Sequence, residues 1–366
     1  MKKLIVVIFM TMLLCGCSAD FNKTEIDEID FIHILSIDYL ENKIVLTAVF
    51  SESSNSGSDE MSVKTISGKG KNMFEAYEDL KKNNNKNISI AHTSFYLIGE
   101  DAGKLGLSNY IDYLSRDETI KMNAFVFVTK DMDASKFLVN TINDESTIHK
   151  DLDAINQKEK QKIKRFNNKI SDLFNVIENN KPILIPYVII LENGFTVEGL
   201  SVFKDLKLYD YLDSNTSLGY NLLKNNIKTL PVYLDNGDGL LITNPSVKFD
   251  PIIINNKIHI NINLKLYSTI KEIKAENLNI MEEIINQNNK LDIIDSLSER
   301  QEDYINTLCD KAINYSISSG IDIFDIQGKV LNNLDLKDLN EEWKEIIKNI
   351  NYNIKIKSQI TRSLLL

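Results

Sequence analysis

Residues 257–270, KIHININLKLYSTI, alternate apolar and polar side chains with the two-residue period of a β-strand. Successive side chains of a strand point to opposite sides, so the apolar members share one face: Ile258, Ile260, Ile262, Leu264 and Leu266. One face would lie in a core while the other meets water, which is typical of antiparallel sheets. The stretch therefore favours an α+β fold, with mixed or antiparallel sheets flanked by helices, over repeated βαβ units.

The segments around this strand extend the pattern into a C-terminal domain. Another strand is predicted at residues 240–248, directly before it. Beyond Glu272, apolar residues recur at near-helical spacing: Ile280, Ile284, Leu291, Ile294, Ile305, Leu308 and Ile313. A last helix is expected around Trp343, and alternation over residues 352–360 predicts a closing strand. We expect an α+β domain over residues 246–366.

All five prolines lie in one region of the chain: Pro182, Pro186, Pro231, Pro245 and Pro251. Because proline fixes φ and lacks an N–H donor, this region should consist of short elements separated by turns. Strands are predicted at residues 187–192, 197–204 and 207–212, with a helix near 217–224. Residues 181–245 would form a small middle α+β domain.

The N-terminal part of the chain predicts a further α+β domain over residues 24–180. In chain order we expect a hairpin of strands 31–38 and 43–51, a strand at 63–67, a turn at Gly68 and Gly70, a helix at 74–80, a strand at 88–98, a helix at 107–114 and a strand at 124–129. A highly charged helical connection follows at residues 146–179, and its basic run is expected to be a solvated face.

The first residues have the pattern of an export signal. Two lysines precede an apolar run from Leu4 to Leu14, and a small residue, Gly16, stands directly before Cys17. As a helix the run would cover about 16 Å, half of the roughly 30 Å hydrocarbon core of a bilayer, so a permanent span is not expected. Residues 14–17, Leu-Cys-Gly-Cys, resemble the bacterial lipobox.

That resemblance implies cleavage before Cys17, which would then carry diacylglycerol on its thiol and an acyl chain on its new amine. Residues 1–16 would be the lipoprotein signal peptide, and residues 17–23 a lipidated tether. More than one acyl chain anchors a protein stably, whereas a single chain binds a membrane only marginally. A plain secretory leader with an incidental cysteine is the alternative.

Composition and charge restrict the class of partner. The chain has 366 residues and a formal net charge of −10, and such an acidic surface repels the phosphates of nucleic acids. We therefore expect no nucleic-acid partner. Of the three cysteines, Cys15 leaves with the leader and Cys17 carries lipid, so Cys309 has no partner for an internal disulfide. Its apolar helical surroundings predict a buried, inert thiol.

No catalytic, metal or cofactor site can be assigned from motifs. His33, His92, His149 and His259 show no metal-ligand spacing, and His-Glu-x-x-His and Cys-x-x-Cys motifs are absent. His92 is of interest, but a general base needs a positioned partner and none can be named. Residues 68–71, Gly-Lys-Gly-Lys, lack the rest of a nucleotide-binding loop, and no Gly-x-Ser-x-Gly elbow occurs. We expect the protein not to be an enzyme.

Several blocks of sequence resemble the blocks of one known protein family. Residues 25–38, EIDEIDFIHILSID, are similar to the family's opening. Residues 88–116, ISIAHTSFYLIGEDAGKLGLSNYIDYLSR, carry its Ala-His, Ile-Gly-Glu, Gly-Leu and Asp-Tyr-Leu-x-Arg elements in order. Residues 199–204, GLSVFK, resemble the strand that opens its second half, and Asp325-Ile326-x-Gly328 with Trp343-Lys344 resemble its end. With these blocks the chain resembles the Ger(x)C proteins, the lipoprotein C subunits of spore nutrient germinant receptors.

This resemblance implies a three-domain lipoprotein on the outer face of the spore inner membrane. It would associate with a membrane A subunit and a transporter-like B subunit, and act in the assembly or signalling of nutrient-triggered germination. Two alternatives stay open: a lipid-anchored extracytoplasmic solute-binding protein, which should show repeated βαβ order and a hinge, and, with less support, a surface hydrolase.

Overall fold

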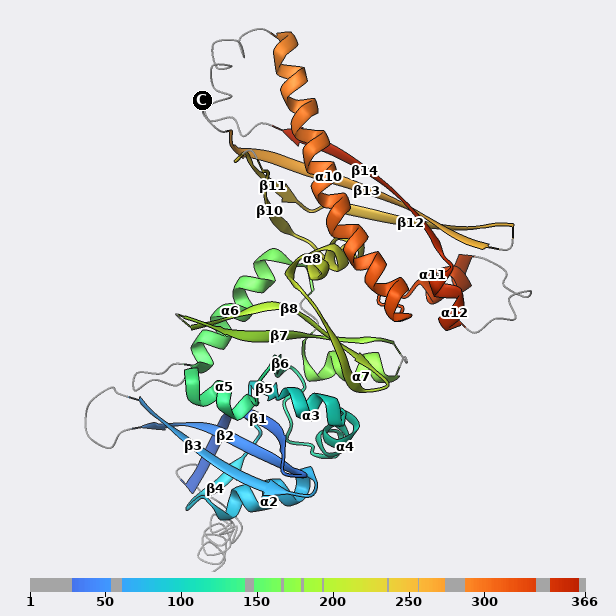
Figure 1. The fold of residues 1–366 in the computed structure, drawn as a ribbon. Coiled ribbons are helices and arrows are strands. Elements are labelled where there is room, and N and C mark those ends of the chain that lie inside the picture. The colour runs from blue at the N-terminus through green and yellow to red at the C-terminus, as the bar shows by residue number, and fades with distance from the viewer. Residues whose placement is uncertain are drawn as a thin grey trace, which may run out of the picture.

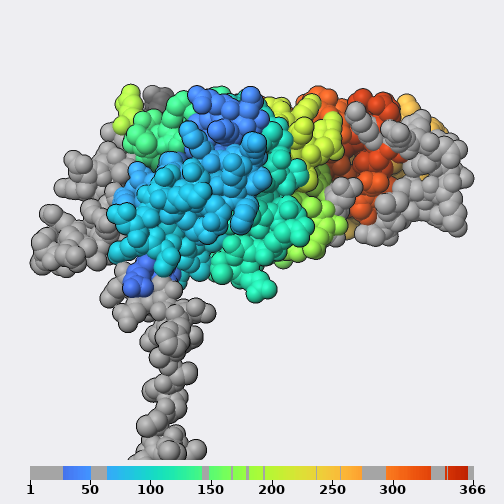
Figure 2. Space-filling model, turned by 90° about the horizontal axis from the view of Figure 1, so that it is seen from below, coloured from blue at the N-terminus to red at the C-terminus, as the bar shows by residue number. Residues whose placement is uncertain are grey.

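The computed structural model describes residues 28–53, 61–141, 148–165, 168–178, 181–192, 194–235, 237–255, 257–273, 287–333 and 343–361. The predicted signal peptide, Cys17 and the tether lie outside these residues. Figure 1 shows two lobes, each built around one β-sheet, and Figure 2 shows from below that they form one elongated body. The expected α+β class, with mixed sheets flanked by helices, is confirmed.

The first lobe contains a nine-stranded mixed sheet. Its strand order is β3 (Met61–Gly70), β2 (Lys43–Ser53), β1 (Ile29–Leu40), β5 (Phe95–Ile98), β6 (Phe125–Thr129), β7 (Ile183–Leu191), β8 (Gly194–Lys204) and β9 (Lys207–Leu212), with β4 (Asn87–Ser89) beside β1. The centre, from β1 through β5 and β6 to β7, is parallel, whereas both outer parts are antiparallel hairpins. Such a buried parallel centre needs helices on both of its faces.

Helices cover both faces of this sheet, and each face has its own apolar cluster. One cluster packs beneath α2 (Met73–Lys82), α4 (Ser108–Arg116) and α7 (Ile170–Glu178). The other packs beneath α5 (Ala134–Thr141) and the first turns of α6 (Ile148–Lys162). The short α3 (Glu100–Leu105) follows β5 directly. Successive residues of β1 reach both clusters, since Ile34 belongs to the second and Leu35 to the first. A shift in register between Ile32 and Ile34 places Ile32 with Leu35 in the first cluster.

The second lobe contains five strands in the order β10 (Thr229–Tyr233), β11 (Gly239–Thr243), β13 (Lys257–Glu272) and β12 (Ser246–Ile254), with β14 (Asn351–Thr361) parallel to β13. The 33-residue α10 (Gln287–Ser319) crosses one face (Figure 1), and α11 (Ile326–Asn333) and α12 (Trp343–Lys348) lie at one end. The alternation of β13 is confirmed, because its five apolar residues are all buried in the cluster under α10.

The two lobes share one apolar core at their junction. The helix α8 (Ser214–Leu223) follows the last strand of the first sheet and packs against α10. The cluster under α10 also includes Val202 of β8 and Leu212 of β9, together with Ile163 just beyond α6. The connection between the lobes is therefore a packed interface of buried side chains, and most of its strength should come from burial of apolar surface.

The first hairpin is confirmed, and its turn has a clear cause. Glu41 and Asn42 both have positive φ, 50° and 60°, as a two-residue turn that matches strand twist requires. The predicted turn at Gly68 and Gly70 is wrong: both glycines lie within β3. A Cβ on either one would overlap the backbone of α2, so these glycines serve close helix–sheet packing.

Two other expectations change in detail. Residues 88–98 do not form one strand, because β4 and β5 are separated by residues 90–94, whose backbone turns at Thr93. Residues 181–245 have no sheet of their own: β7, β8 and β9 belong to the first sheet, while β10 and β11 belong to the second. Which sheet each of these strands joins is decided by pairing with strands far away in the chain, and the local sequence does not reveal those partners. The three domain boundaries themselves stay a prediction.

Candidate functional site at the junction of the lobes

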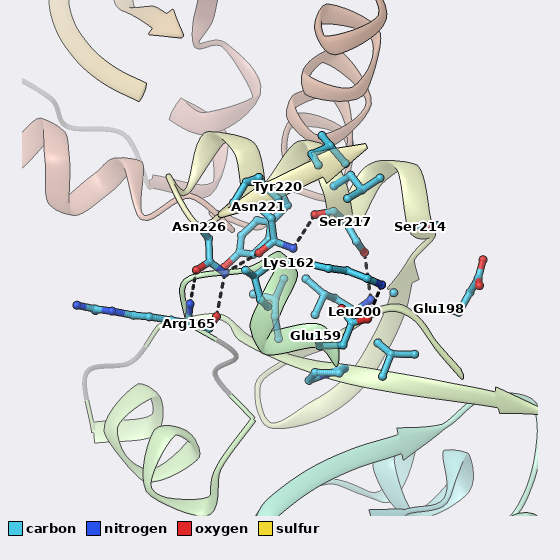
Figure 3. A pocket seen from close by; sticks show the side chains of 18 of the residues that line it. Glu159, Lys162, Arg165, Glu198, Leu200, Ser214, Ser217, Tyr220, Asn221 and Asn226 are labelled. Carbon is cyan, nitrogen blue, oxygen red and sulfur yellow. Dashed lines mark hydrogen bonds and ion pairs between the residues drawn. The ribbon is translucent and has the colours of Figure 1, made fainter. Parts of the chain in front are cut away.

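A pocket of about 160 Å³ lies where the two lobes meet. Its walls come from α6, β7, β8, α8 and β10, so both sheets contribute (Figure 3). Apolar side chains make up much of the lining: Ile163, Leu184, Val197, Leu200, Ile227 and Leu230. Pockets at such junctions are the common places for small ligands, which makes this the candidate site.

Asparagine side chains tie one wall of the pocket together. The Asn226 amide accepts a hydrogen bond from the Arg165 backbone N–H at 2.7 Å and donates to the Arg165 carbonyl at 2.9 Å. It also donates to Oδ1 of Asn221 at 2.8 Å, and Asn221 in turn donates to the Ser217 carbonyl at 3.0 Å. These amides are used to join the end of α6 to α8, so they hold the wall in place and are not free for a ligand.

The Ser217 hydroxyl is also engaged. Its Oγ donates to the Leu212 carbonyl and accepts from the Leu200 N–H, both at 3.1 Å. A Cβ on Gly199 would lie 3.0 Å from this oxygen and would overlap the Leu212 carbonyl. Gly199, part of the block that resembles the family's second half, therefore lets α8 approach β8. No histidine lines the pocket to activate Ser217, so this hydroxyl is structural.

One ion pair lines the pocket along α6. Lys162 Nζ lies 2.6 Å from Oε1 of Glu159, whose side chain is 15% exposed. Figure 3 shows Lys162 extending towards Ser217, while Arg165 and Glu198 point outward. The pair could meet the two charged ends of a small zwitterion, but its members would first have to separate from each other. Chemically the pocket offers apolar walls and one satisfied ion pair.

Three of the four histidines lie together, which their spacing in the sequence did not predict. The rings of His33 and His149 stack at 5.5 Å, and His92 packs edge-on against Phe31 at 4.4 Å. Burial lowers the pKa of His33, and the nearby charges of His149 and His92 lower it further. Among the described residues, no group of three or more His, Cys, Asp or Glu side chains could hold a metal ion.

The predicted inert thiol is confirmed. Cys309 is fully buried in α10, and burial raises the pKa of its thiol to about 12. A thiol that stays protonated is a poor nucleophile. Cys17, the predicted lipidation site, lies outside the described residues, and its modification stays a prediction.

The Ile-Gly-Glu element of the resemblance has a structural role in the first lobe. Asp38, buried at the end of β1, accepts hydrogen bonds from the N–H groups of Ala134 and Ser135 at 2.6 and 2.8 Å, and so caps the start of α5. Burial raises the pKa of this carboxyl, against the effect of those hydrogen bonds. A Cβ on Gly99 would overlap Asp38 Oδ1, so only glycine fits there.

The neighbouring Glu100 holds a loop. Its carboxylate accepts from the Asp131 N–H at 2.5 Å and pairs with Lys104 at 2.6 Å. Burial opposes ionisation, but these partners outweigh it and lower the pKa of Glu100. The Ile-Gly-Glu element therefore specifies how the end of β5 joins α3 and how the loop at Asp131 is held.

Comparisons with known proteins agree with this architecture. Residues 22–190 match the family described as spore germination protein N-terminal domain, and residues 198–364 match spore germination B3/GerAC like, C-terminal. The solved crystal structure of the GerBC protein is similar, with a TM-score of 0.56 at 15% identity over 89% of this chain and 96% of that one. At this identity the likeness concerns the fold. No curated protein matches the chain.

Proposed function

The chain belongs to the GerAC-like family of spore germination proteins, and from this premise we propose that it is the C subunit of a nutrient germinant receptor. The observation that carries the proposal is the order and extent of the two family domains, which together run from residue 22 to residue 364. The likeness to GerBC supports it, since the match spans 96% of that chain.

Within the receptor we propose a non-catalytic role in assembly or signalling. The continuous core between the lobes supports a scaffold, because a packed junction keeps two binding surfaces at a constant distance and angle. The junction pocket supports the same role, since its hydroxyl and amides are used in joining α6, β8 and α8. Such a subunit would work through the partners it holds together, the A and B membrane subunits.

We further propose that lipid on Cys17 holds the protein at the outer face of the spore inner membrane. The leader pattern before Cys17 supports the anchor. In the described part of the chain no helix is both long and apolar enough to cross a bilayer. Tethering would raise the effective concentration of this subunit near its membrane partners, which favours assembly without any added contact.

The test is release of dipicolinic acid from spores that lack the protein or carry Cys17→Ala. The expected result is loss of the response to nutrients with an intact response to a trigger that bypasses the receptors. Cys309→Ala is the matched control, because it removes the buried thiol and leaves the predicted lipid site. If spores without the protein keep every nutrient response and no redundant receptor is present, the proposal fails.

A solute-binding protein is the second candidate, and the pocket between the lobes is the observation that favours it. Calorimetric titration of the purified protein with amino acids and sugars distinguishes the two. Direct binding that Leu218→Trp, a substitution in the pocket lining, abolishes would support solute binding. Absence of binding together with the germination defect would support the receptor subunit.

A further inference from the structure

The second sheet has an open face. On β13 the side chains of even-numbered residues from Ile258 to Ser268 are buried under α10, so the odd-numbered ones point to the other side. The register assigns neighbours on that side: Ser246 and Lys357 flank Lys265, and Lys248 and Lys355 flank Asn263. These residues are exposed or half-buried, which shows that the described chain leaves this face uncovered.

The charges on this face are unlike those of the whole protein. Across β12, β13 and β14 it carries five lysines: Lys248, Lys257, Lys265, Lys355 and Lys357. The described strands place two carboxylates on it: Asp250, which pairs with Lys248 at 2.7 Å, and Glu272 at the far end of β13, beyond a shift in register. The chain as a whole has a net charge of −10. A cationic face on an acidic protein attracts anionic surfaces and orients the molecule as it approaches them.

The end of the same face is apolar. Ile252, Ile253 and Ile254, just before the turn between β12 and β13, are 38%, 42% and 45% exposed. Figure 1 shows this hairpin reaching outward at the right, beyond α10 and α11. By the register, Ile252 and Ile254 stand beside His259 and Lys257, on the side that carries the lysines. Three adjacent exposed isoleucines next to lysines match the composition of surfaces that bind the boundary between lipid headgroups and acyl chains.

We propose that this face binds an anionic lipid bilayer, with the isoleucine tip entering the headgroup region and the lysines contacting lipid phosphates. The inference rests on the proposed membrane location and does not depend on the germination role. Charge complementarity selects the partner, since an array of lysines on one face suits an array of lipid phosphates. The bilayer also gives the exposed isoleucine side chains of the tip an apolar place in which to be buried. The contact would orient a protein that is otherwise held only by a tether.

The experiment places a fluorescent probe at the tip. The full chain is purified from membranes with Ile254→Cys, labelled with an environment-sensitive dye and reconstituted into vesicles. The parent protein gives the background labelling, and Cys309 is buried. In phosphatidylglycerol vesicles the emission should shift to the blue and be quenched by brominated lipid, and in phosphatidylcholine vesicles it should not. Each lysine near an anionic surface raises the affinity for the membrane about fivefold. The three changes Lys265→Gln, Lys355→Gln and Lys357→Gln together should therefore lower that affinity roughly 100-fold.

A probe at Val139→Cys is the control, because that position is 67% exposed and lies on α5 of the first lobe, away from the lysine face of the second sheet. It should respond equally in both kinds of vesicle. Equal emission of the tip probe in anionic and neutral vesicles would overturn the proposal, as would a shift that survives loss of the three lysines. A shift that needs other membrane proteins would show that this face binds a protein partner instead. None of these outcomes depends on the germination assay.

Discussion

Lys181 Nζ lies 2.8 Å from Oδ2 of Asp325, although 144 residues separate them in the sequence. Lys181 lies two residues before β7 of the first sheet, and Asp325 directly precedes α11 of the second lobe, so this ion pair bridges the junction. Asp325 has a positive φ of 56°, and a Cβ on Gly328 would lie 2.9 Å from its carboxylate. Asp325 and Gly328 both belong to the Asp-Ile-x-Gly element, which therefore forms part of the junction between the lobes.

The apolar packing at this junction should matter more than the ion pair. Lys181 and Asp325 are 49% and 35% exposed, so Lys181→Ala should lower the free energy of unfolding by about 1 kcal/mol or less. Gly219 of α8 lies against the carbonyl of Leu308, and a methyl group there would overlap it. Gly219→Ala should destabilise by about 1–3 kcal/mol or more, even though alanine favours a helix.

Thermal and urea unfolding would measure this difference. Asn215→Ala, an exposed change in the same helix, is the control and should stay within about 0.5 kcal/mol of the parent. A Gly219→Ala protein as stable as the control would show that α8 and α10 can separate without loss.

The pair of Gly99 and Asp38 makes a second prediction. Gly99→Ala should lower stability by about 2 kcal/mol, because its methyl group displaces the carboxylate that caps α5. Asp38→Ala should also destabilise, since it leaves two N–H groups at the start of α5 without their acceptor. The double variant removes the overlap, so it should lose less than the two single changes combined.

In spores, these variants should lower the amount of protein and leave the nutrient sensitivity of each remaining molecule unchanged. Immunoblots with dipicolinic acid release would separate the two effects. Additive losses of stability, or normal abundance with lost signalling, would contradict a purely structural role for this element.

The ion pair of Arg300 and Asp238 gives a third prediction. Asp238 is 1% exposed, and the Arg300 guanidinium donates to its Oδ2 at 2.8 Å. Arg300→Leu should destabilise by about 2 kcal/mol, less than a fully buried pair because Arg300 is 36% exposed. Adding Asp238→Asn should restore part of the loss, since a neutral amide tolerates burial better than a carboxylate. Urea unfolding at neutral pH would measure the stability of the single and the double variant. A double variant no more stable than Arg300→Leu would argue against burial of the Asp238 charge as the cause.

Lys329 should make stability depend on alkaline pH. Burial, and then the nearby charge of Lys224, lower its pKa to about 8 in the folded protein, against an ordinary value of 10.5. Between these two values the unfolded chain binds more protons, so the contribution of Lys329 to the free energy of unfolding rises with pH. The contribution of Lys329 to the free energy of unfolding is least favourable below pH 8 and reaches its highest value above pH 10.5.

Lys329→Met should remove this rise, which is on the order of 1–3 kcal/mol. Urea unfolding from pH 7 to 11 would measure it, with Lys311→Met on the exposed side of α10 as the control. The same pH profile in parent and Lys329→Met would mean that the ammonium is solvated in the folded protein. Because Lys329 also donates to the Phe324 carbonyl, the comparison uses the slopes and not the absolute stabilities.

Much of the fold follows from short-range patterns. The strand β13 and the closing strand β14 show the two-residue alternation that a half-buried strand requires. The apolar runs of β1 and β2, separated by a two-residue turn, were enough to predict the first hairpin. The buried state of Cys309 follows from its apolar helical neighbours. Glycines were harder to interpret, because Gly68 and Gly70 serve close contact with α2, and glycine in a sequence indicates a turn and a close contact equally well.

The junction pocket could not be predicted in this way. Its wall joins Arg165 to Asn226, and its ion pair lies on α6, which nothing in the local sequence places beside β8 or β10. The same holds for the stacked rings of His33 and His149, which are distant along the chain. Such sites depend on which surfaces of distant elements meet.

Local sequence alone was enough for the α+β class, the family resemblance and the apolar faces, since side-chain alternation and backbone preferences act between near neighbours. Tertiary structure decided that residues 181–245 contribute strands to both sheets, that one core joins the lobes, and that the lysines of β12, β13 and β14 form one face. The physical reason is that strand pairing and core packing join residues far apart in the chain, and each is selected by the free energy of the whole fold.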